Sequence, residues 1–257
     1  MTSDTSPHGR APAPPVHPII ARMDLWHVPL EIDERLADAA ARVLDDAERA
    51  RAQRFAHPHD RRRWIAARAA LRHILGAACS MPSDQVRFRL GEHGKPELGQ
   101  AGDAAVHPGA PDAPAFNLSH SGVLALIVVC DRPVGVDLEL LERADERHED
   151  IQSVFSPAER AAIAAAPLTQ RPLASYRCWT RKEALLKAAG CGFALDDTTR
   201  FTVSIDAQAK LLGSNHRRLA MGEWSLRALE QPGTRTGAVA VRGAMPPCTE
   251  HHWHWPA

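Results

Sequence analysis

The chain has 257 residues, of which 44% are hydrophobic and 24% are charged, and its formal net charge at pH 7 is zero. These values are typical of a soluble globular protein with one large domain or two of ordinary size. They argue against a nucleic-acid-binding protein, which would be basic, and no window is apolar over the length of a membrane span. The first residues also lack the apolar core of a secretory signal, so we expect a cytoplasmic protein with no membrane partner.

Residues 1–22 contain five prolines, which predicts a disordered N-terminal tail. A strand is predicted over residues 24–30 and a helix over residues 34–54, with Asp33 as the N-cap. A second helix is predicted over residues 60–75. The five cysteines are scattered, odd in number and without metal-type spacing, so we expect free thiols.

Arginine is concentrated in these two helices. Asp60 is the only acid among residues 49–72, a span that contains eight arginines: Arg49, Arg51, Arg54, Arg61, Arg62, Arg63, Arg68 and Arg72. One interpretation is a solvated surface whose charge is balanced by the acids Asp45, Asp46 and Glu48 just before it. The other is a phosphate site, because arginine binds phosphate oxygens in a bidentate manner. Charge alone does not decide between the two.

The middle of the chain begins with a strand predicted over residues 86–90, where polar and apolar side chains alternate. Residues 91–96 contain two glycines and end in proline, which indicates a turn. Residues 99–114 are rich in glycine, proline and alanine and are predicted to be a loop insertion.

A predicted strand with two carboxylates follows a predicted buried strand. The sequence Phe-Asn-Leu-Ser-His-Ser-Gly at 116–122 precedes an apolar strand predicted over residues 123–130, and another strand is predicted over residues 134–141. Asp137 and Glu139 lie two residues apart in that strand, so they point to the same face. Two adjacent carboxylates repel each other, and a hard divalent cation such as Mg²⁺ is the simplest way to balance them.

The second half contains the longest predicted helix, from about residue 172 to Gly190. It includes the sequence Trp-Thr-Arg-Lys-Glu-Ala-Leu-Leu-Lys at 179–187, in which Glu183 and Lys187 are one turn apart on one face. An isolated pair of this kind is usually a surface ion pair. A capping box at Ser156 predicts a shorter helix over residues 158–165.

The remaining sequence predicts three more strands, over residues 201–205, 224–229 and 236–241. The histidine-rich end is predicted to be irregular, and its histidines are interpreted as a surface tract in preference to a metal site. The chain is therefore divided into a tail (1–22), an N-terminal α+β subdomain (23–131), a C-terminal α+β subdomain with the carboxylates (132–245), and an irregular tail (246–257).

Four motifs, taken together and in order, resemble the 4′-phosphopantetheinyl transferase superfamily in its larger, surfactin-synthetase-type branch. They are Gly94-Lys95-Pro96, Phe116-Asn117-Leu118-Ser119-His120-Ser121, Gly135-Val136-Asp137-Leu138-Glu139, and the segment from Trp179 to Lys187. The resemblance implies an α+β fold of two similar subdomains in a pseudo-two-fold arrangement, with the active site in the cleft between them. It also implies a monomer.

The family resemblance implies an enzyme that moves the phosphopantetheine arm of coenzyme A onto a serine of an acyl or peptidyl carrier protein. The second product is 3′,5′-ADP, and the metal is Mg²⁺, with Mn²⁺ as the alternative. Carriers of fatty-acid, polyketide and nonribosomal-peptide synthesis all remain open. The competing hypotheses are another Mg²⁺-dependent phosphoryl-transfer enzyme and a non-catalytic module that binds coenzyme A or a carrier protein.

The same resemblance assigns roles to individual residues. Asp137, Glu139 and Glu183 are expected to hold Mg²⁺. Lys187 is expected to neutralise the diphosphate and to support the departing group. The proton of the carrier serine would be taken by Glu183 or by a water on the metal, and the sequence does not choose between them.

Further residues are expected to bind coenzyme A, again by resemblance. The 3′-phosphate end is assigned to Ser119, His120, Arg63 and Arg68. The adenine pocket is assigned to Gly94, Lys95 and Pro96. Trp179 is expected to serve in packing.

Overall fold

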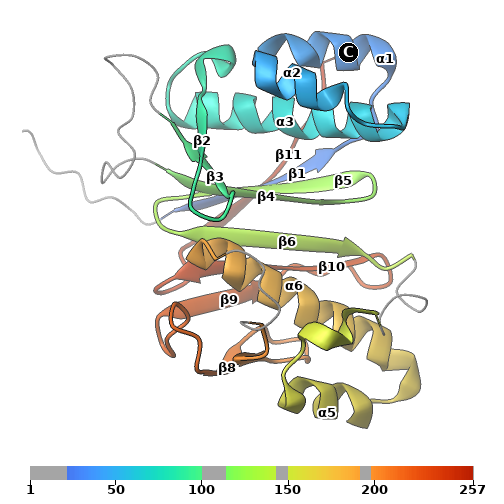
Figure 1. Cartoon of the computed structure of the whole chain (residues 1–257), viewed down its shortest axis with the longest axis vertical. Helices are drawn as coiled ribbons and strands as arrows, with labels where there is room; N and C mark the ends of the chain where they lie inside the picture. Colours follow the sequence, from blue (N-terminus) through green and yellow to red (C-terminus); the bar gives the residue numbers. More distant parts are fainter. Residues whose placement is uncertain (1–21, 100–113, 143–149, 192–197, 257) are drawn as a thin grey trace, which may run out of the picture.

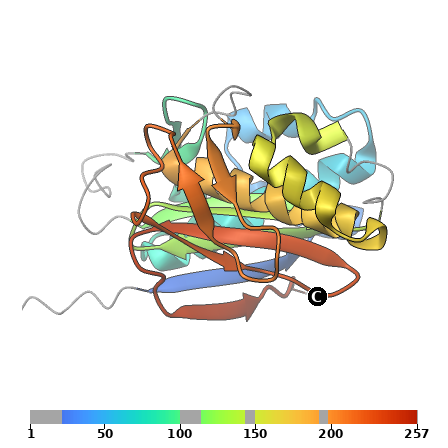
Figure 2. The ribbon, with the colours of Figure 1, turned by 90° about the horizontal axis from the view of Figure 1, so that it is seen from below.

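The computed structural model describes residues 22–99, 114–142, 150–191 and 198–256, and it has the mixed α+β class predicted from the sequence. Residues 1–21 of the tail predicted at 1–22, and residues 100–113 of the loop insertion predicted at 99–114, lie outside the described residues. Two sheets lie between two long helices, α3 (Pro58–Ala78) and α6 (Arg171–Ala189), as Figures 1 and 2 show. No helix in the described ranges is long and apolar enough to cross a membrane.

The first sheet has the strand order β11-β1-β5-β4 and the second has the order β6-β10-β9. The strands of the first sheet are β1 (Met23–Pro29), β4 (Ala115–Ser121), β5 (Leu124–Cys130) and β11 (Cys248–His252). Those of the second are β6 (Val134–Leu140), β9 (Trp224–Ala228) and β10 (Arg235–Arg242). Two small ribbons pair β2 (Phe88–Leu90) with β3 (Pro96–Leu98), and β7 (Phe201–Val203) with β8 (Leu211–Ser214).

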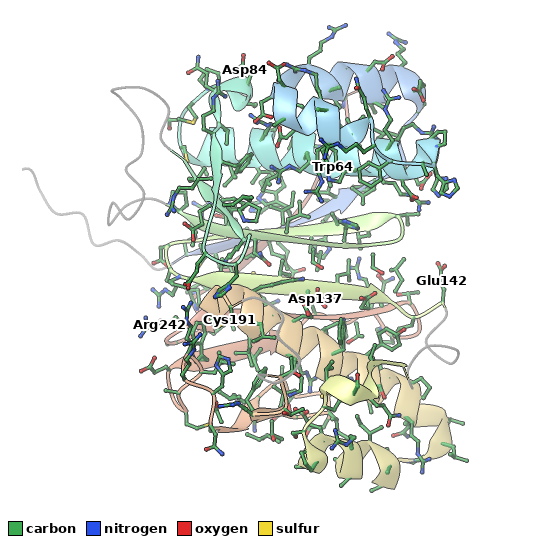
Figure 3. The ribbon with its side chains drawn as sticks, viewed as in Figure 1. Trp64, Asp84, Asp137, Glu142, Cys191 and Arg242 are labelled. Atoms are coloured by element: carbon green, nitrogen blue, oxygen red, sulfur yellow. The ribbon has the colours of Figure 1, made fainter. Side chains whose placement is uncertain are left out.

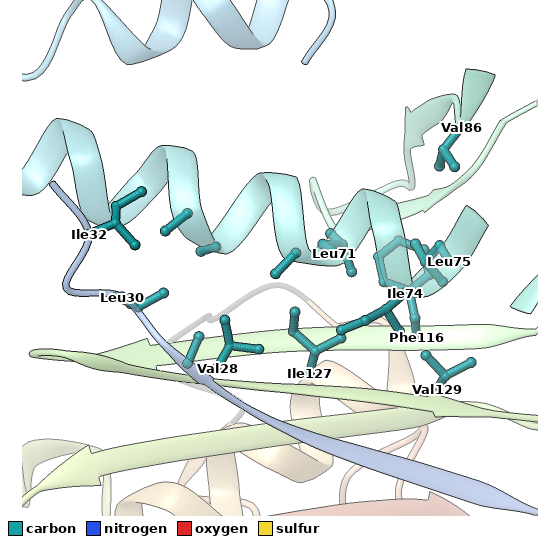
Figure 4. Packing of buried hydrophobic residues seen from close by; sticks show 14 of the residues in the cluster. Val28, Leu30, Ile32, Leu71, Ile74, Leu75, Val86, Phe116, Ile127 and Val129 are labelled. Atoms are coloured by element: carbon teal, nitrogen blue, oxygen red, sulfur yellow. The ribbon is translucent and has the colours of Figure 1, made fainter. Parts of the chain in front are cut away.

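Strand β5 lies at the centre of the packing, because alternate side chains point to opposite sides of a sheet. Ala125, Ile127 and Val129 pack with α3 in one buried cluster, part of which is shown in Figure 4. Leu126 and Val128 belong to a second cluster, which lies between the two sheets. The strand is buried on both sides, and its apolar run is therefore unbroken.

The helix predicted over residues 34–54 is two helices in the structure. Helix α1 (Glu34–Ala40) runs into a 3₁₀ turn at Ala41–Val43, and α2 (Asp46–Ala52) follows. Leu44 is extended between them, and Asp45 caps α2 through a capping box with Glu48. The Asp-x-x-Glu pattern is a recognised helix start, so the break was detectable in the sequence.

The C-terminal segment is not irregular as predicted. Residues Cys248–His252 form β11, which pairs in parallel with β1 and completes the first sheet. Glu250 accepts hydrogen bonds from His27 at 3.1 Å and from Arg227 of β9 at 2.7 Å. His251 stacks on Trp26, with 4.2 Å between the ring centroids. The sequence of β11 shows no alternation of apolar and polar residues, because its contacts are made by the polar side chains of Glu250 and His251.

The remaining elements are α5 (Pro157–Ala165) and the 3₁₀ turns Ser83–Gln85, Asp150–Val154 and Leu168–Gln170. Helix α5 begins at the predicted capping box. The predicted division at 131/132 falls in the turn between β5 and β6, whereas β11 crosses that division to join the first sheet. All five cysteines are free thiols.

Candidate active site

Helix α6 is held against the second half by two buried cations of its central motif. Arg181 donates to the carbonyl of Ser204 at 2.5 Å and to that of Asp206 at 2.6 Å. Lys182 lies 2.9 Å from Glu159 of α5 and donates to two backbone carbonyls at 2.7 Å. The next motif residue, Glu183, lies instead beside Lys187 and the β6 residue Asp137.

Gly135 allows α6 to lie directly on β6. A Cβ atom at this position would lie 2.2 Å from the carbonyl oxygen of Ala184 and 2.4 Å from the backbone nitrogen of Ala188. Both contacts are far below van der Waals distance and involve backbone, so only glycine permits this approach. The glycine at the start of the Gly-Val-Asp-Leu-Glu motif therefore sets the distance between the two elements that carry the carboxylates.

Three carboxylates and one ammonium group meet between β6 and α6. Asp137 is buried and lies on β6, between the strand and α6 in Figure 3. The Nζ atom of Lys187 lies 2.5 Å from Oδ1 of Asp137 and 3.6 Å from Oε2 of Glu183. Glu139 is half-buried on the same strand. The structure thus brings together all four residues that the two motifs singled out.

The pKa values of the side chains in this cluster are shifted by burial and by the neighbouring charges. Burial, followed by the charge of Asp137, raises the pKa of Glu139. Burial is also the main reason that the pKa of Glu183 is raised, although Lys187 opposes it. Burial disfavours the charged form of Lys187, but Asp137 and Glu183 outweigh that effect and raise its pKa. The cluster therefore carries more negative charge than its one ammonium group balances.

One atom of the cluster has an unmet bonding capacity. Oδ2 of Asp137 is buried and has no hydrogen-bond partner, which is costly for a carboxylate oxygen. Among the described residues, no three side chains stand in a geometry that would already enclose a metal ion. The donor set of three carboxylates nevertheless has the oxygen chemistry that Mg²⁺ requires.

Ser119 lies beside the carboxylates and not in an anion pocket. Its hydroxyl donates to Oδ1 of Asp137 at 2.8 Å. Ser121, two residues along β4, donates to Oε2 of Glu139 at 2.9 Å. The Ser119 hydroxyl is thus bound to Asp137, one of the expected metal ligands, and its assignment to the 3′-phosphate end stays a prediction. Alternate positions of a strand share a face, so the Ser-His-Ser pattern could have revealed Ser121.

His120 points to a cavity of about 390 Å³ at the end of β4. The cavity is lined by Arg51, near the end of α2, and by Arg63 and Trp64 of α3; Figure 3 labels Trp64. Desolvation and the nearby Lys187 lower the pKa of His120. Arg63 also pairs with Glu31 at 2.6 Å, on the exposed side. This cavity contains the predicted Arg63 and His120, and it adds Arg51, which the sequence analysis did not select.

Arg68 does not belong to that cavity. Its guanidinium lies 2.6 Å from Glu48, a buried carboxylate that also accepts from Arg72 at 2.6 Å. Arg68 further stacks over Phe88, at 4.5 Å from the ring centroid. The structure therefore places Arg68 in an ion-pair network that joins α2 and α3, and its assignment to the 3′-phosphate stays a prediction.

The turn of the Gly-Lys-Pro motif lies at the other end of β4. Lys95 and Pro96 line a cavity of about 320 Å³ with Phe116 and with the end of α6, whereas Gly94 is not part of this lining. Nζ of Lys95 donates to the carbonyls of Val134 and Lys187 at 3.0 and 2.7 Å. Burial lowers the pKa of Lys95 to about 8. The ammonium group thus joins the turn to β6 and α6.

Trp179 has a role beyond the packing expected of it. It packs against the core of the second half, and its indole also donates a hydrogen bond to Glu139. Trp179 and Glu183 are four residues apart, so they lie on one face of α6. The helical spacing alone could have placed Trp179 near the carboxylates.

Comparison with known proteins adds independent findings. A family model described as "4′-phosphopantetheinyl transferase, N-terminal" matches residues 33–131, and one described as "4′-phosphopantetheinyl transferase superfamily" matches residues 133–241. The chain is 35% identical over 238 residues to the 4′-phosphopantetheinyl transferase HetI of Nostoc sp., covering 92% of this chain and 94% of HetI. It is 36% identical over 132 residues to AcpT of Escherichia coli K12, covering 51% of this chain and 58% of AcpT. It is 27% identical over 152 residues to Sfp of Bacillus subtilis 168, covering 59% of this chain and 62% of Sfp. Both of these relatives are also named 4′-phosphopantetheinyl transferases.

Proposed function

The chain belongs to the 4′-phosphopantetheinyl transferase superfamily, and on that basis we propose that it transfers the phosphopantetheine arm of coenzyme A to a serine of an acyl or peptidyl carrier protein. The observation that carries the proposal is the meeting of Asp137, Glu139, Glu183 and Lys187 between β6 and α6. Family models that match both halves support the larger, surfactin-synthetase-type branch.

Asp137, Glu139 and Glu183 are the residues that would hold Mg²⁺ or Mn²⁺. The partnerless Oδ2 of Asp137 and the raised pKa values of the two glutamates support this assignment, since both features are relieved by a cation. When bound, the metal would neutralise charge on the diphosphate of coenzyme A.

The reaction forms a bond between the carrier serine oxygen and the phosphorus that carries the pantetheine arm. The bond from that phosphorus to the bridging oxygen breaks, and 3′,5′-ADP leaves with the electron pair. Lys187, with its raised pKa, stays protonated at neutral pH and balances the charge on the bridging oxygen. Its reach toward both Asp137 and Glu183 keeps it fixed beside the diphosphate.

Glu183 is our choice for the base that removes the serine proton. Its carboxylate lies 3.6 Å from Lys187, the residue proposed to balance the leaving group, so it stands beside the reacting diphosphate. Its side chain is half-buried, so part of it remains open to solvent and to a carrier serine.

The cavity lined by Arg51, Arg63 and His120 is proposed to hold the 3′-phosphate end of coenzyme A. Two guanidinium groups and an imidazole supply the donors that a phosphate needs, and they outnumber the one carboxylate in the lining, that of Asp60. The Gly-Lys-Pro turn remains the proposed contact for adenine, through its backbone and the Pro96 ring, because the Lys95 ammonium already binds two carbonyls. One chain supplies the whole site, which is compatible with a monomer.

The test is intact-protein mass spectrometry of an apo carrier protein incubated with this protein, coenzyme A and Mg²⁺. We expect a gain of one phosphopantetheine arm, which is lost with EDTA. Asp137→Asn and Glu183→Gln should abolish the gain, whereas Asp131→Asn, in an exposed turn next to the same strand, should not. Binding of coenzyme A without modification of fatty-acid or peptide-synthetase carriers would favour a binding module instead.

A further inference from the structure

The two halves of the protein meet through side chains where β4 lies beside β6. In the part of the chain that the structure describes, β4 pairs only with β5, and β6 pairs only with β10. Ladder hydrogen bonds between the two backbones therefore do not fix the separation of β4 and β6. Three side chains at alternate positions of β4 cross the gap instead: Asn117, Ser119 and Ser121.

Each of the three side chains binds a different point of β6. The buried Asn117 accepts from the backbone nitrogen of Val136 at 2.9 Å. Ser119 donates to Oδ1 of Asp137 at 2.8 Å. The matching two-residue spacing on both strands lets the hydroxyls reach successive carboxylates on β6.

The hydroxyl of Ser121 has a fixed direction. Its oxygen accepts from the backbone nitrogen of Leu140 at 3.1 Å, and its proton is then directed to Oε2 of Glu139 at 2.9 Å. The carboxylate of Glu139 is thereby oriented by the backbone of its own strand through a side chain of β4.

Ser119 has an equivalent effect on Asp137. Its hydroxyl and Lys187 both donate to Oδ1, which leaves the buried Oδ2 of the same carboxylate without a partner. The two donors on one oxygen therefore settle which oxygen of Asp137 is available to a cation.

We propose that Ser119 and Ser121 are positioning residues, which hold the carboxylates of Asp137 and Glu139 in the orientation that binds the divalent cation. This inference rests on the proposed function, because it assigns the two serines to the metal ligands of that site. It differs from the role in phosphate binding that the family resemblance gave to Ser119. Partners behind metal ligands typically change metal affinity about 10–100-fold when they are removed.

The experiment measures Mn²⁺ binding directly, from the paramagnetic resonance signal of free Mn²⁺ at a fixed concentration of coenzyme A. We expect the dissociation constant to rise about 10–100-fold in Ser119→Ala and Ser121→Ala. Ser121→Thr keeps the hydroxyl and should stay within about threefold of the wild type. The matched control is Ser225→Ala in β9, which loses a 2.7 Å bond to the carbonyl of Gly243 and should leave Mn²⁺ affinity unchanged.

A kinetic measurement separates positioning from phosphate binding. For Ser119→Ala, the Mg²⁺ concentration needed for half-maximal activity should rise, and the change should be the same with coenzyme A and with dephospho-coenzyme A. A higher KM for coenzyme A alone would make Ser119 a ligand of the 3′-phosphate and would overturn its positioning role. If an alanine variant does not fold, Ser119→Cys and Ser121→Cys keep the volume and weaken the donor, with the same expected result.

The outcomes for the two proposals are distinct. Wild-type protein that neither binds Mn²⁺ nor modifies a carrier would remove the proposed function itself. Normal wild-type protein, with Mn²⁺ affinity unchanged in folded serine variants, would overturn only the positioning role.

Discussion

Replacement of Gly135 by alanine should damage activity more than stability. The added Cβ would lie 2.2 Å from the Ala184 carbonyl oxygen, so α6 must move away from β6 by about 1 Å to restore an ordinary contact. Overpacking of this kind costs about 1–3 kcal/mol, and we expect the upper part of that range because the opposing atoms are backbone. For a chain of this size, that corresponds to a fall in melting temperature of roughly 4–12 °C.

The loss of activity follows from what α6 carries. Glu183 and Lys187 would move with the helix while Asp137 and Glu139 stay on β6, and a misplacement of about 1 Å costs about 100-fold in rate. Carrier modification under single-turnover conditions, at a temperature where the variant is folded, measures this loss. The control is Gly213→Ala in β8, where an added Cβ meets nothing within 4 Å. A Gly135→Ala variant with at least half of the wild-type rate would refute the reasoning.

Three further predictions concern buried and titrating groups. Lys182→Met leaves the buried carboxylate of Glu159 without its cation and should lower the free energy of unfolding, measured by urea titration, by about 3–5 kcal/mol. A clearly smaller decrease would contradict this prediction. The sequence has only four lysines, so reductive ¹³C-methylation should give few NMR signals, and that of Lys95 should titrate with a midpoint of about 8. Burial lowers the pKa of His73, so below about pH 6.5 the unfolded state binds more protons, and stability is lost as the pH falls. His73→Gln should reduce that loss between pH 7 and pH 5, and an unchanged slope in thermal unfolding would contradict it.

The elements that the sequence predicted well have a strong local signal. The central helix was recognised from residues of high helix propensity between a proline and Gly190, and the structure ends it there with glycine in the left-handed region, at φ 65°. Asp137 and Glu139 were placed on one face of a strand by the two-residue period alone. Both conclusions depend only on neighbouring residues, which a sequence displays directly.

The features that were missed depend on contacts between distant segments. Strand β11 pairs with β1 across more than two hundred residues, and nothing in Cys248–His252 marks that partner. Arg68 and Arg63 look equivalent in the sequence, yet Arg68 pairs with the buried Glu48, whereas Arg63 pairs with the exposed Glu31 and lines a cavity. Which arginine remains available for a ligand is decided by the fold of α2 against α3.

The charge of the carboxylate cluster explains why its components occur together. Asp137, Glu139 and Glu183 contribute three negative charges when ionised, and Lys187 contributes one positive charge, so the cluster retains a charge of about −2. Burial is the main cause of the raised pKa values of the two glutamates, and the charge of Asp137 adds to it. A divalent cation would balance the excess negative charge. Lys187 therefore serves the site best as a partial counterion: it makes the buried carboxylates tolerable in the folded chain, and it leaves the remaining charge to the metal and the substrate.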